Sequence, residues 1–160
     1  MFEREKGSVE IVTYEDRFQP AFRDLNAAWI STYFRLEPHD FEQLDNPREQ
    51  IIDRGGEIFV ALFKGEPIGV CALIRTKGEG NVYELAKFAV HPKMQGLGIG
   101  DLLCRAVITR ARELGGKTIF IDGNTKLHAA LHLYRKHGFK EVPMSQTPYA
   151  RVDIQLELTL

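Results

Sequence analysis

The chain has 160 residues, of which 44% are hydrophobic and 27% are charged, and its formal net charge at pH 7 is −1. These values are typical of a globular protein with its own hydrophobic core, so we predict a single domain over residues 1–160. The near-zero charge argues against a nucleic-acid-binding surface. No apolar run approaches the roughly 18 residues that span a bilayer, and the charged residues 1–7 do not resemble a signal peptide. We expect a cytoplasmic protein that binds neither nucleic acid nor membrane.

The first half of the chain predicts a strand, two helices and a hairpin. Apolar residues recur at helical spacing after Gln19. Pro38 precedes the second helical stretch and Gly55-Gly56 follows it. Lys64-Gly65-Glu66 indicates the turn of the hairpin. The expected elements are a strand over residues 9–14, helices over 19–34 and 40–52, and hairpin strands over 57–64 and 67–77.

The second half alternates strands and helices. Pro92 ends a strand-like stretch, and glycines follow both helical stretches, at residues 115–116 and 138. The expected elements are strands over 83–91, 118–122, 139–142 and 151–158, and helices over about 101–114 and 125–137. This order predicts an α/β fold, α+β in some schemes, in which helices cover the faces of a mixed sheet.

Residues 95–100 read Gln-Gly-Leu-Gly-Ile-Gly and lie between a predicted strand and a predicted helix. Glycines at such a junction let the backbone turn sharply and approach a ligand closely. The first N–H groups of a helix have no partner within it, and the helix dipole favours an anion in front of them. The segment therefore indicates a phosphate or pyrophosphate cradle, although an ordinary tight turn would also explain the glycines.

The spacing of these glycines excludes two common phosphate-binding motifs. A dinucleotide fingerprint needs Gly-x-Gly-x-x-Gly, but the sixth position counted from Gly96 is Asp101 and from Gly98 it is Leu103. A Walker loop needs Gly, four residues and Gly-Lys-Ser/Thr. Gly116-Lys117-Thr118 lacks the required earlier glycine and leads into a strand. What remains is the pattern Gln-x-x-Gly-x-Gly.

This pattern, at Gln95, Gly98 and Gly100, resembles the acetyl-CoA pyrophosphate loop of the GNAT superfamily of N-acetyltransferases. The resemblance covers nearly the whole chain and is firmest over residues 83–142, where the segments ELAKFAVHP, NTKL and LYRKHGFKEVP also match in order and spacing. The chain is most similar to small bacterial GNAT proteins that also occur fused to MarR-type regulators. Because no such regulator precedes the domain in this sequence, we do not expect DNA binding. The resemblance implies a mixed, mostly antiparallel sheet of about seven strands, flanked by about four helices.

The resemblance also implies which residues bind acetyl-CoA. The end of the strand before the cradle would pair its backbone with the pantetheine arm, and one N–H there would hold the thioester oxygen. A small residue on the later helix would let the cofactor pass. The apolar members of this set are equally explained as core. The implied cofactor-binding residues are Phe88, Ala89, Val90, Gln95, Gly96, Leu97, Gly98, Ile99, Gly100, Asp101, Asn124 and Ala130.

Two side chains are candidate catalysts under the same resemblance. Glu84 lies 11 residues before Gln95, where the histone-type branch of the superfamily has its general base, although it could equally face solvent at a strand start. Lys87 could pair with it, but the two are three residues apart on a strand and so should face opposite ways. Tyr134 corresponds to the tyrosine that protonates the departing CoA sulfur. The alternative is an aromatic packing residue with its hydroxyl in water.

The cysteines and histidines suggest no competing chemistry. Cys71 and Cys104 lie in apolar segments, which predicts buried, unreactive thiols rather than a disulfide or a nucleophile. His128 and His132 are four residues apart on a predicted helix and could share a metal ion. No further ligand is spaced with them as in a zinc motif, so we expect no metal.

Taken together, these features predict an enzyme that transfers an acetyl group from acetyl-CoA, its co-substrate, directly to a primary amine of a small molecule or a residue. The alternative is a catalytically weak module that binds or senses acyl-CoA. Trp29, Tyr33, Phe34 and Arg35 are candidates for the wall of the acceptor pocket, although such residues are more often core. A homodimer is possible, and the sequence does not identify the acceptor.

Overall fold

The computed structural model describes residues 9–76, 78 and 80–160. Within this part of the chain, seven strands form one sheet in the order β1-β2-β3-β4-β5-β7-β6. Neighbouring strands are antiparallel except β4 and β5, which run parallel. Lys77 and Glu79, which the sequence placed in a strand end and a turn, lie outside the described residues. The strands are β1 (Val9–Thr13), β2 (Glu57–Phe63), β3 (Glu66–Arg75), β4 (Val82–Val90), β5 (Thr118–Gly123), β6 (Lys140–Val142) and β7 (Ile154–Thr159).

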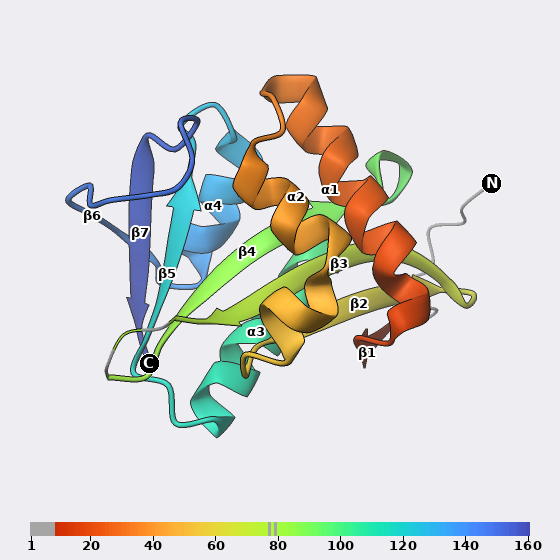
Figure 1. Ribbon diagram of the computed structural model, residues 1–160, viewed down its shortest axis with the longest axis horizontal. Coiled ribbons are helices and arrows are strands. Elements are labelled where there is room, and N and C mark those ends of the chain that lie inside the picture. Colours follow the sequence, from red (N-terminus) through yellow and green to blue (C-terminus); the bar gives the residue numbers. More distant parts are fainter. Residues whose placement is uncertain (1–8, 77, 79) are drawn as a thin grey trace.

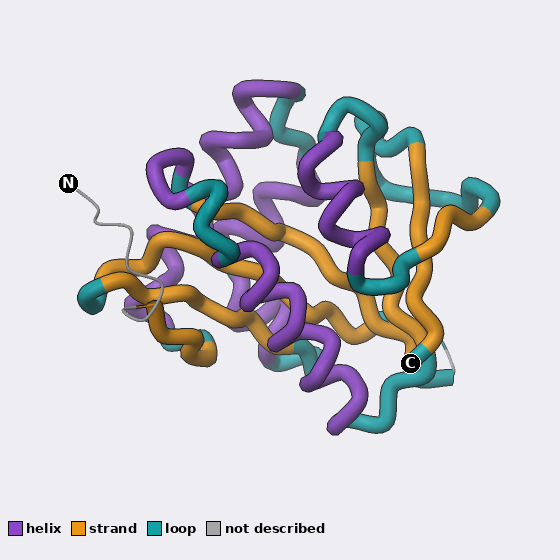
Figure 2. The backbone as a smooth tube through the Cα atoms, turned by 180° about the vertical axis from the view of Figure 1, so that it is seen from behind, coloured by secondary structure: helices purple, strands orange, loops and turns teal. Residues whose placement is uncertain are grey.

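Helices cover both faces of the sheet. The first face carries α1 (Gln19–Tyr33) and α2 (Pro38–Asp45), seen in front of the sheet in Figure 1. The reverse face carries α3 (Ile99–Glu113) and α4 (His128–Lys136), which Figure 2 shows nearer the viewer. Each face buries its own apolar cluster. This arrangement confirms the predicted fold class. The short turns are η2 (Asp16–Phe18), η3 (Arg48–Ile52) and η4 (Pro92–Met94).

The single helix predicted over residues 40–52 is wrong, because the chain breaks it in two. α2 ends before Asn46, whose φ of −134° and ψ of 55° are not helical. Pro47 follows, and a proline disfavours the helical conformation of the residue before it. The chain then resumes as the π-helical turn η3. Pro38 is the first residue of α2 rather than a residue before it, a position where its missing N–H costs nothing.

Two predicted boundaries near the end of the chain are also corrected. The helix predicted from residue 125 begins at His128, and the strand predicted from residue 151 begins at Ile154. The Asp153 carboxylate accepts hydrogen bonds from the backbone and the hydroxyl of Thr125, and the Asn124 side chain accepts one from the Lys126 N–H. Such side-chain contacts hold both segments as turns instead of regular elements.

A β-bulge in β4 reverses which way its side chains point. Ala72 of β3 pairs with Ala86 and Val70 pairs with Ala89, so Lys87 and Phe88 together oppose Cys71. Lys87 has φ of +50°, a left-handed conformation that is rare for residues with a side chain. The extra residue shifts the alternation by one. Glu84 and Lys87 therefore line the same cavity, and the expectation that they face opposite ways is wrong.

The two cysteines are buried, as predicted. Cys71 on β3 and Cys104 on α3 are both free thiols with no exposed surface. Burial raises the pKa of Cys71, and it raises the pKa of Cys104 to about 12. Neither thiol forms the reactive thiolate at neutral pH.

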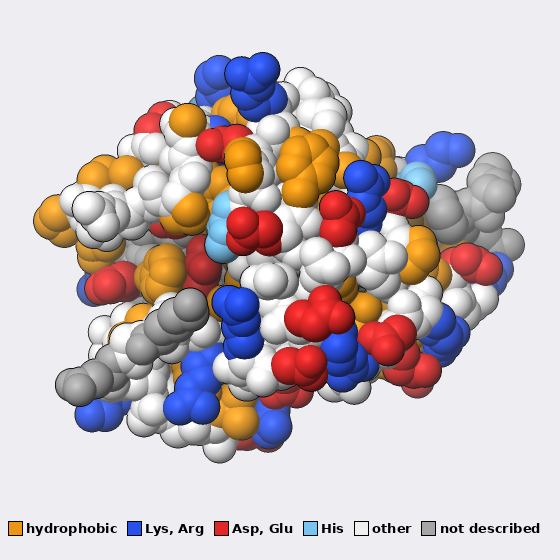
Figure 3. All heavy atoms as spheres, viewed as in Figure 1, with side chains coloured by type: hydrophobic (Ala, Val, Ile, Leu, Met, Phe, Trp, Pro, Cys, Tyr) orange, Lys and Arg blue, Asp and Glu red, His pale blue; other side chains and the backbone are white. Residues whose placement is uncertain are grey.

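The surface carries both signs of charge. Figure 3 shows acidic and basic side chains interspersed over the face that α1 and α2 form.

In the described part of the chain, no helix is both long and apolar enough to cross a bilayer. Within those same residues, no group of three or more His, Cys, Asp or Glu side chains is placed to hold a metal ion.

Candidate functional site

The site lies where the two parallel strands of the sheet part. The ladder between β4 and β5 joins only residues 82–84 to residues 118–120, while β4 continues to Val90. Backbone groups beyond Glu84 on this side therefore have no partner strand. A cleft of about 580 Å³ opens there, and its walls come from β4, the loop after it, the start of α3, the end of β5 and α4.

The glycine-rich segment forms one end of this cleft. Gly98 precedes the first residue of α3 in a left-handed conformation, with φ of +80°, and no side chain caps the helix there. α3 begins at Ile99, two residues earlier than predicted, so the first free N–H groups belong to the segment itself. Gly100 lies in the first turn, where a Cβ would come within 3.1 Å of the Phe88 ring. The Gln95 side chain donates a hydrogen bond to the Val90 carbonyl, 3.2 Å away, and ties the loop to the strand end.

The cleft brings together most of the predicted cofactor-binding residues, with two exceptions. Leu97 packs its side chain into the core and is 9% exposed. Asp101 turns its carboxylate to Arg105, Lys136 and His137, at 2.9, 3.2 and 2.8 Å. For these two residues only the backbone remains for a ligand. The predicted residues that line the cleft are Phe88, Ala89, Val90, Gln95, Gly96, Gly98, Ile99, Gly100, Asn124 and Ala130.

We expect Gly98→Val to weaken acetyl-CoA binding at least about tenfold, because its side chain stands where backbone should face the phosphates and a β-branched residue resists φ of +80°. Backbone strain alone costs roughly 1–3 kcal/mol of stability. Titration calorimetry with acetyl-CoA measures the affinity. Gly65→Val is the matched control, since Gly65 has φ of +81° in the turn between β2 and β3, with no atom within 4 Å of a Cβ. The control should lose stability and keep its affinity. An unchanged affinity in Gly98→Val would contradict the cradle.

Tyr134 lies on α4 and lines the cleft. Its ring lies between those of Phe88 and Phe139, with centroids 6.2 and 6.0 Å away. The residue is 8% exposed, and burial raises the pKa of its hydroxyl well above the ordinary value. The hydroxyl therefore stays protonated and can donate a hydrogen bond throughout the neutral pH range.

Asn124 lines the cleft and also makes hydrogen bonds that stabilise the fold. Its amide nitrogen donates to the Arg151 carbonyl at 2.6 Å, and its oxygen accepts from the Lys126 N–H at 2.8 Å. These contacts tie the end of β5 to the loop that precedes β7. A ligand can use only the remaining hydrogen-bonding capacity of the side chain or the neighbouring backbone.

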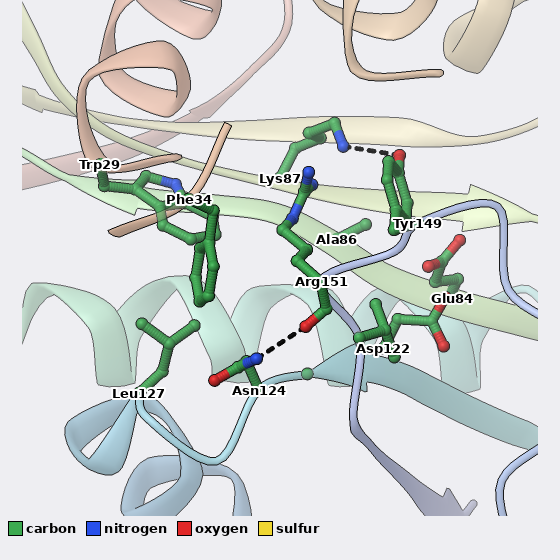
Figure 4. A pocket seen from close by; sticks show the side chains of 12 residues that line it. Trp29, Phe34, Glu84, Ala86, Lys87, Asp122, Asn124, Leu127, Tyr149 and Arg151 are labelled. Carbon is green, nitrogen blue, oxygen red and sulfur yellow. Dashed lines mark hydrogen bonds between the residues drawn. The ribbon is translucent and has the colours of Figure 1, made fainter. Parts of the chain in front are cut away.

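Glu84 lines a smaller cavity of about 60 Å³ that shares walls with the cleft. Figure 4 shows its carboxylate beside that of Asp122, at the end of the cavity opposite Trp29 and Phe34. Burial, and then the negative charge of Asp122, raise the pKa of Glu84 to about 8, against a smaller opposing effect of Lys87. Asp122 itself accepts hydrogen bonds from Gln155 at 2.8 Å and Thr147 at 2.9 Å.

A buried ionic network forms the wall beside this cavity. Asp40, at the start of α2, accepts two hydrogen bonds of 2.7 Å from the Arg151 guanidinium and one of 2.9 Å from the Lys87 ammonium. Lys87 also donates to the Tyr149 hydroxyl at 2.8 Å. Burial alone would raise the pKa of Asp40, but Arg151 and Lys87 outweigh it and lower the value to about 2. The network joins α2, the bulge in β4 and the loop before β7.

Sequence reasoning missed Asp122, Lys87, Tyr149 and Arg151 as parts of the site. Asp122 lies near the end of a short apolar strand, and a polar residue at such a position is a sequence signal for the end of a strand where a site can form. The bulge at Lys87 leaves no pattern in the sequence, and Tyr149 and Arg151 lie in an irregular segment. Trp29 and Phe34, named as candidate pocket walls, do line the cavity.

Comparison with known sequences relates the chain to one protein family. A family model described as the acetyltransferase (GNAT) family matches residues 18–139. An amino-acid acetyltransferase of Mannheimia succiniciproducens is 29% identical over 111 residues, which are 69% of this chain and 22% of that protein. An amino-acid acetyltransferase of Pseudomonas fluorescens Pf0-1 is 30% identical over 105 residues, 66% of this chain and 23% of that protein. The chain thus spans less than a quarter of the length of these relatives.

Solved structures share the fold over nearly the whole chain. A GNAT-family acetyltransferase of Staphylococcus aureus Mu50 superposes with a TM-score of 0.84 at 20% identity, covering 94% of this chain and 98% of that one. The structure of yncA from Salmonella typhimurium, which includes its cofactor acetyl-CoA, has a TM-score of 0.76 at 17% identity, covering 95% and 94%. At these identities the likeness concerns the fold alone. Because the family match spans most of the sequence and the fold agrees with it, the chain belongs to the acetyltransferase (GNAT) family.

Proposed function

We propose that this protein is an acetyl-CoA-dependent N-acetyltransferase that transfers an acetyl group directly to a primary amine. The observation that carries the proposal is one continuous cleft. It runs from the glycine-rich start of α3 along the free edge of β4 to Tyr134, and it shares walls with the cavity that holds Glu84. A candidate phosphate-binding end, a candidate acid and a candidate base thus lie along one path.

The residues of the cleft fit acetyl-CoA, and its presence in the Salmonella relative supports the assignment. The free N–H groups at the start of α3 would hold the pyrophosphate. The edge of β4 over Phe88–Val90, which has no partner strand, would bond the pantetheine arm and the thioester oxygen through its free backbone groups. Leu97 and Asp101 would contribute backbone only. Acetyl-CoA would supply the acetyl thioester that the amine attacks.

Glu84 is the proposed proton acceptor. An alkylamine with a pKa near 10.4 arrives as an ammonium ion and must lose a proton before it can attack. The pKa of Glu84, raised to about 8, makes its carboxylate a stronger base than an ordinary glutamate, although only a minority is ionised at pH 7. An ammonium ion entering the cavity would favour the ionised form.

Acetyl-CoA turnover with a panel of primary amines tests the proposal, with thiol release as the readout. We expect thiol release that depends on the amine and an acetylated product by mass spectrometry. A module that only senses acyl-CoA would bind acetyl-CoA by calorimetry and release no thiol with any amine. That result would overturn the proposed catalysis and leave the cofactor site in place.

We expect Tyr134→Phe to lower kcat about ten- to a hundredfold, while the acetyl-CoA dissociation constant hardly changes. The hydroxyl would matter only as charge develops on the departing sulfur. A thiolate with a pKa of about 8.5 partly leaves unassisted, and a hydroxyl whose pKa is raised assists mainly by hydrogen bonding, so the loss stays moderate. Tyr83→Phe makes the same change at a buried tyrosine outside the cleft and should keep full turnover. Full turnover in Tyr134→Phe, with lower stability, would make Tyr134 a packing residue.

A further inference from the structure

Two carboxylates face the acceptor cavity without a cation of their own. Among the described residues, no group donates a hydrogen bond to Glu84, and Asp122 bonds only the neutral side chains of Thr147 and Gln155. Ionising both groups without a cationic partner is costly, because burial disfavours each charge and the two charges repel each other. A bound cation would relieve both. Because Glu84 and Asp122 come from neighbouring strands that part at this point, the space between them opens into the cavity.

The two cations that line the same cavity are already engaged. Arg151 directs both terminal nitrogens to Asp40, and one of them also reaches Glu37 at 3.3 Å. Lys87 directs its ammonium to Asp40 and the Tyr149 hydroxyl. An α-amino acid needs a cation or several free donors for its carboxylate. Taking Arg151 or Lys87 for that purpose would leave the fully buried Asp40 short of a partner.

The opposite end of the cavity is lined by apolar side chains, and Lys126, which lines the neighbouring cleft, has its ammonium 5.8 Å from the centroid of the Phe34 ring. The rings of Trp29 and Phe34 lie edge to face with centroids 6.5 Å apart, and Leu127 lies beside them. The Trp29 N–H is satisfied by the Asn26 side chain at 3.2 Å, which leaves the ring surfaces as the contact area. These walls suit a hydrocarbon or aromatic body attached to the ammonium group.

We infer that the cavity between Glu84 and Asp122 takes an alkyl- or arylalkylamine, whose amino carbon carries no carboxylate, and discriminates against α-amino acids. Asp122 is then a specificity-determining residue that binds the acceptor ammonium. The inference rests on the proposed function, which makes the ligand of this cavity the acetyl acceptor. It separates this chain from the amino-acid acetyltransferases that it resembles in sequence.

Matched ligand pairs that differ by one carboxylate test the inference. 2-Phenylethylamine is compared with phenylalanine, and 3-methylbutylamine with leucine, by titration calorimetry against the protein saturated with CoA at pH 7. In at least one pair we expect the amine to bind about tenfold or more tightly than the amino acid, since an unpaired carboxylate in the cavity is repelled and desolvated. The inference would be overturned if the amino acid bound as tightly as the amine, or more tightly, in both pairs. It would also be overturned if neither amine bound at millimolar concentration.

Asp122→Asn provides the second test, because asparagine keeps the shape of Asp122 and can still bond Thr147 and Gln155. At about pH 9, where Glu84 is ionised in both proteins, we expect it to weaken amine binding about tenfold and leave acetyl-CoA binding unchanged. Asp53→Asn, the same change at an exposed site, should alter neither. Unchanged amine affinity in Asp122→Asn would overturn the role of Asp122. Thiol release is scored separately. Preferred binding of amines without transfer refutes the proposed function alone, whereas efficient acetylation of amino acids in preference to amines refutes the inference alone.

Discussion

Glu84→Gln is expected to lower kcat/KM by about 10²–10⁴-fold near pH 8, because a positioned proton acceptor usually accelerates a reaction by that factor. Glutamine keeps the size of the side chain and cannot accept a proton. Acetyl-CoA binding should be nearly unchanged, because Glu84 lines the acceptor cavity rather than the cradle. Glu10→Gln changes an exposed carboxylate on β1 and serves as the control, with wild-type activity expected.

The pH dependence makes this prediction more specific. A general base works only when ionised, and the pKa of Glu84 is raised to about 8. With an acceptor that binds as its ammonium ion, wild-type kcat/KM should therefore rise with pH below about 8 and level off above it. The inflection should be absent in Glu84→Gln. Asp122→Asn removes a charge that raises this pKa, so the inflection should move to lower pH. Full activity of Glu84→Gln from about pH 6 to 9 would show that Glu84 is structural.

Local patterns predicted the glycine turn into α3 well, because near neighbours in the sequence set its conformation. The glycine at position 98 precedes α3 with positive φ, and the free N–H groups follow directly in the sequence. Strand and helix periodicity likewise depends on near neighbours, and it located all seven strands of the sheet. The helix predicted over residues 40–52 failed for an equally local reason, the conformational bias that Pro47 imposes on Asn46.

The acceptor side could not be predicted because its contacts are long-range. Asp40 and Arg151 are 111 residues apart in sequence, and Thr147 meets Asp122 across 25. The bulge at Lys87 depends on pairing with β3, and one extra residue decides whether its side chain faces Glu84 or the opposite core. A periodic pattern cannot reveal such a shift. The proposed base was thus identified by position, while the groups that set its pKa and its ligand emerged only in three dimensions.

The buried network beside the cavity leads to a prediction about stability. Asp40→Asn should lower the free energy of unfolding by about 3–5 kcal/mol at pH 7, because it leaves Lys87 buried without its counter-charge and leaves Arg151 with Glu37 alone. Urea unfolding measures the change. Asp45→Asn in the same helix removes an exposed ion pair with Arg23 and should cost only about 0–1 kcal/mol. Equal stabilities of the two variants would show that the network contributes no more than a surface pair.

The same network predicts how stability changes in acid. The pKa of Asp40 is lowered from 3.8 to about 2 in the folded protein, so its contribution is fully present above pH 3.8 and is lost as pH falls towards 2. The shift corresponds to roughly 2 kcal/mol. The stability gap between the wild type and Asp40→Asn should therefore narrow between about pH 4 and 2. Protonation removes the charge of Asp40 and leaves the size of its side chain unchanged. A gap that stays constant over this range would therefore show that Asp40 stabilises the fold by shape and hydrogen bonding rather than by charge.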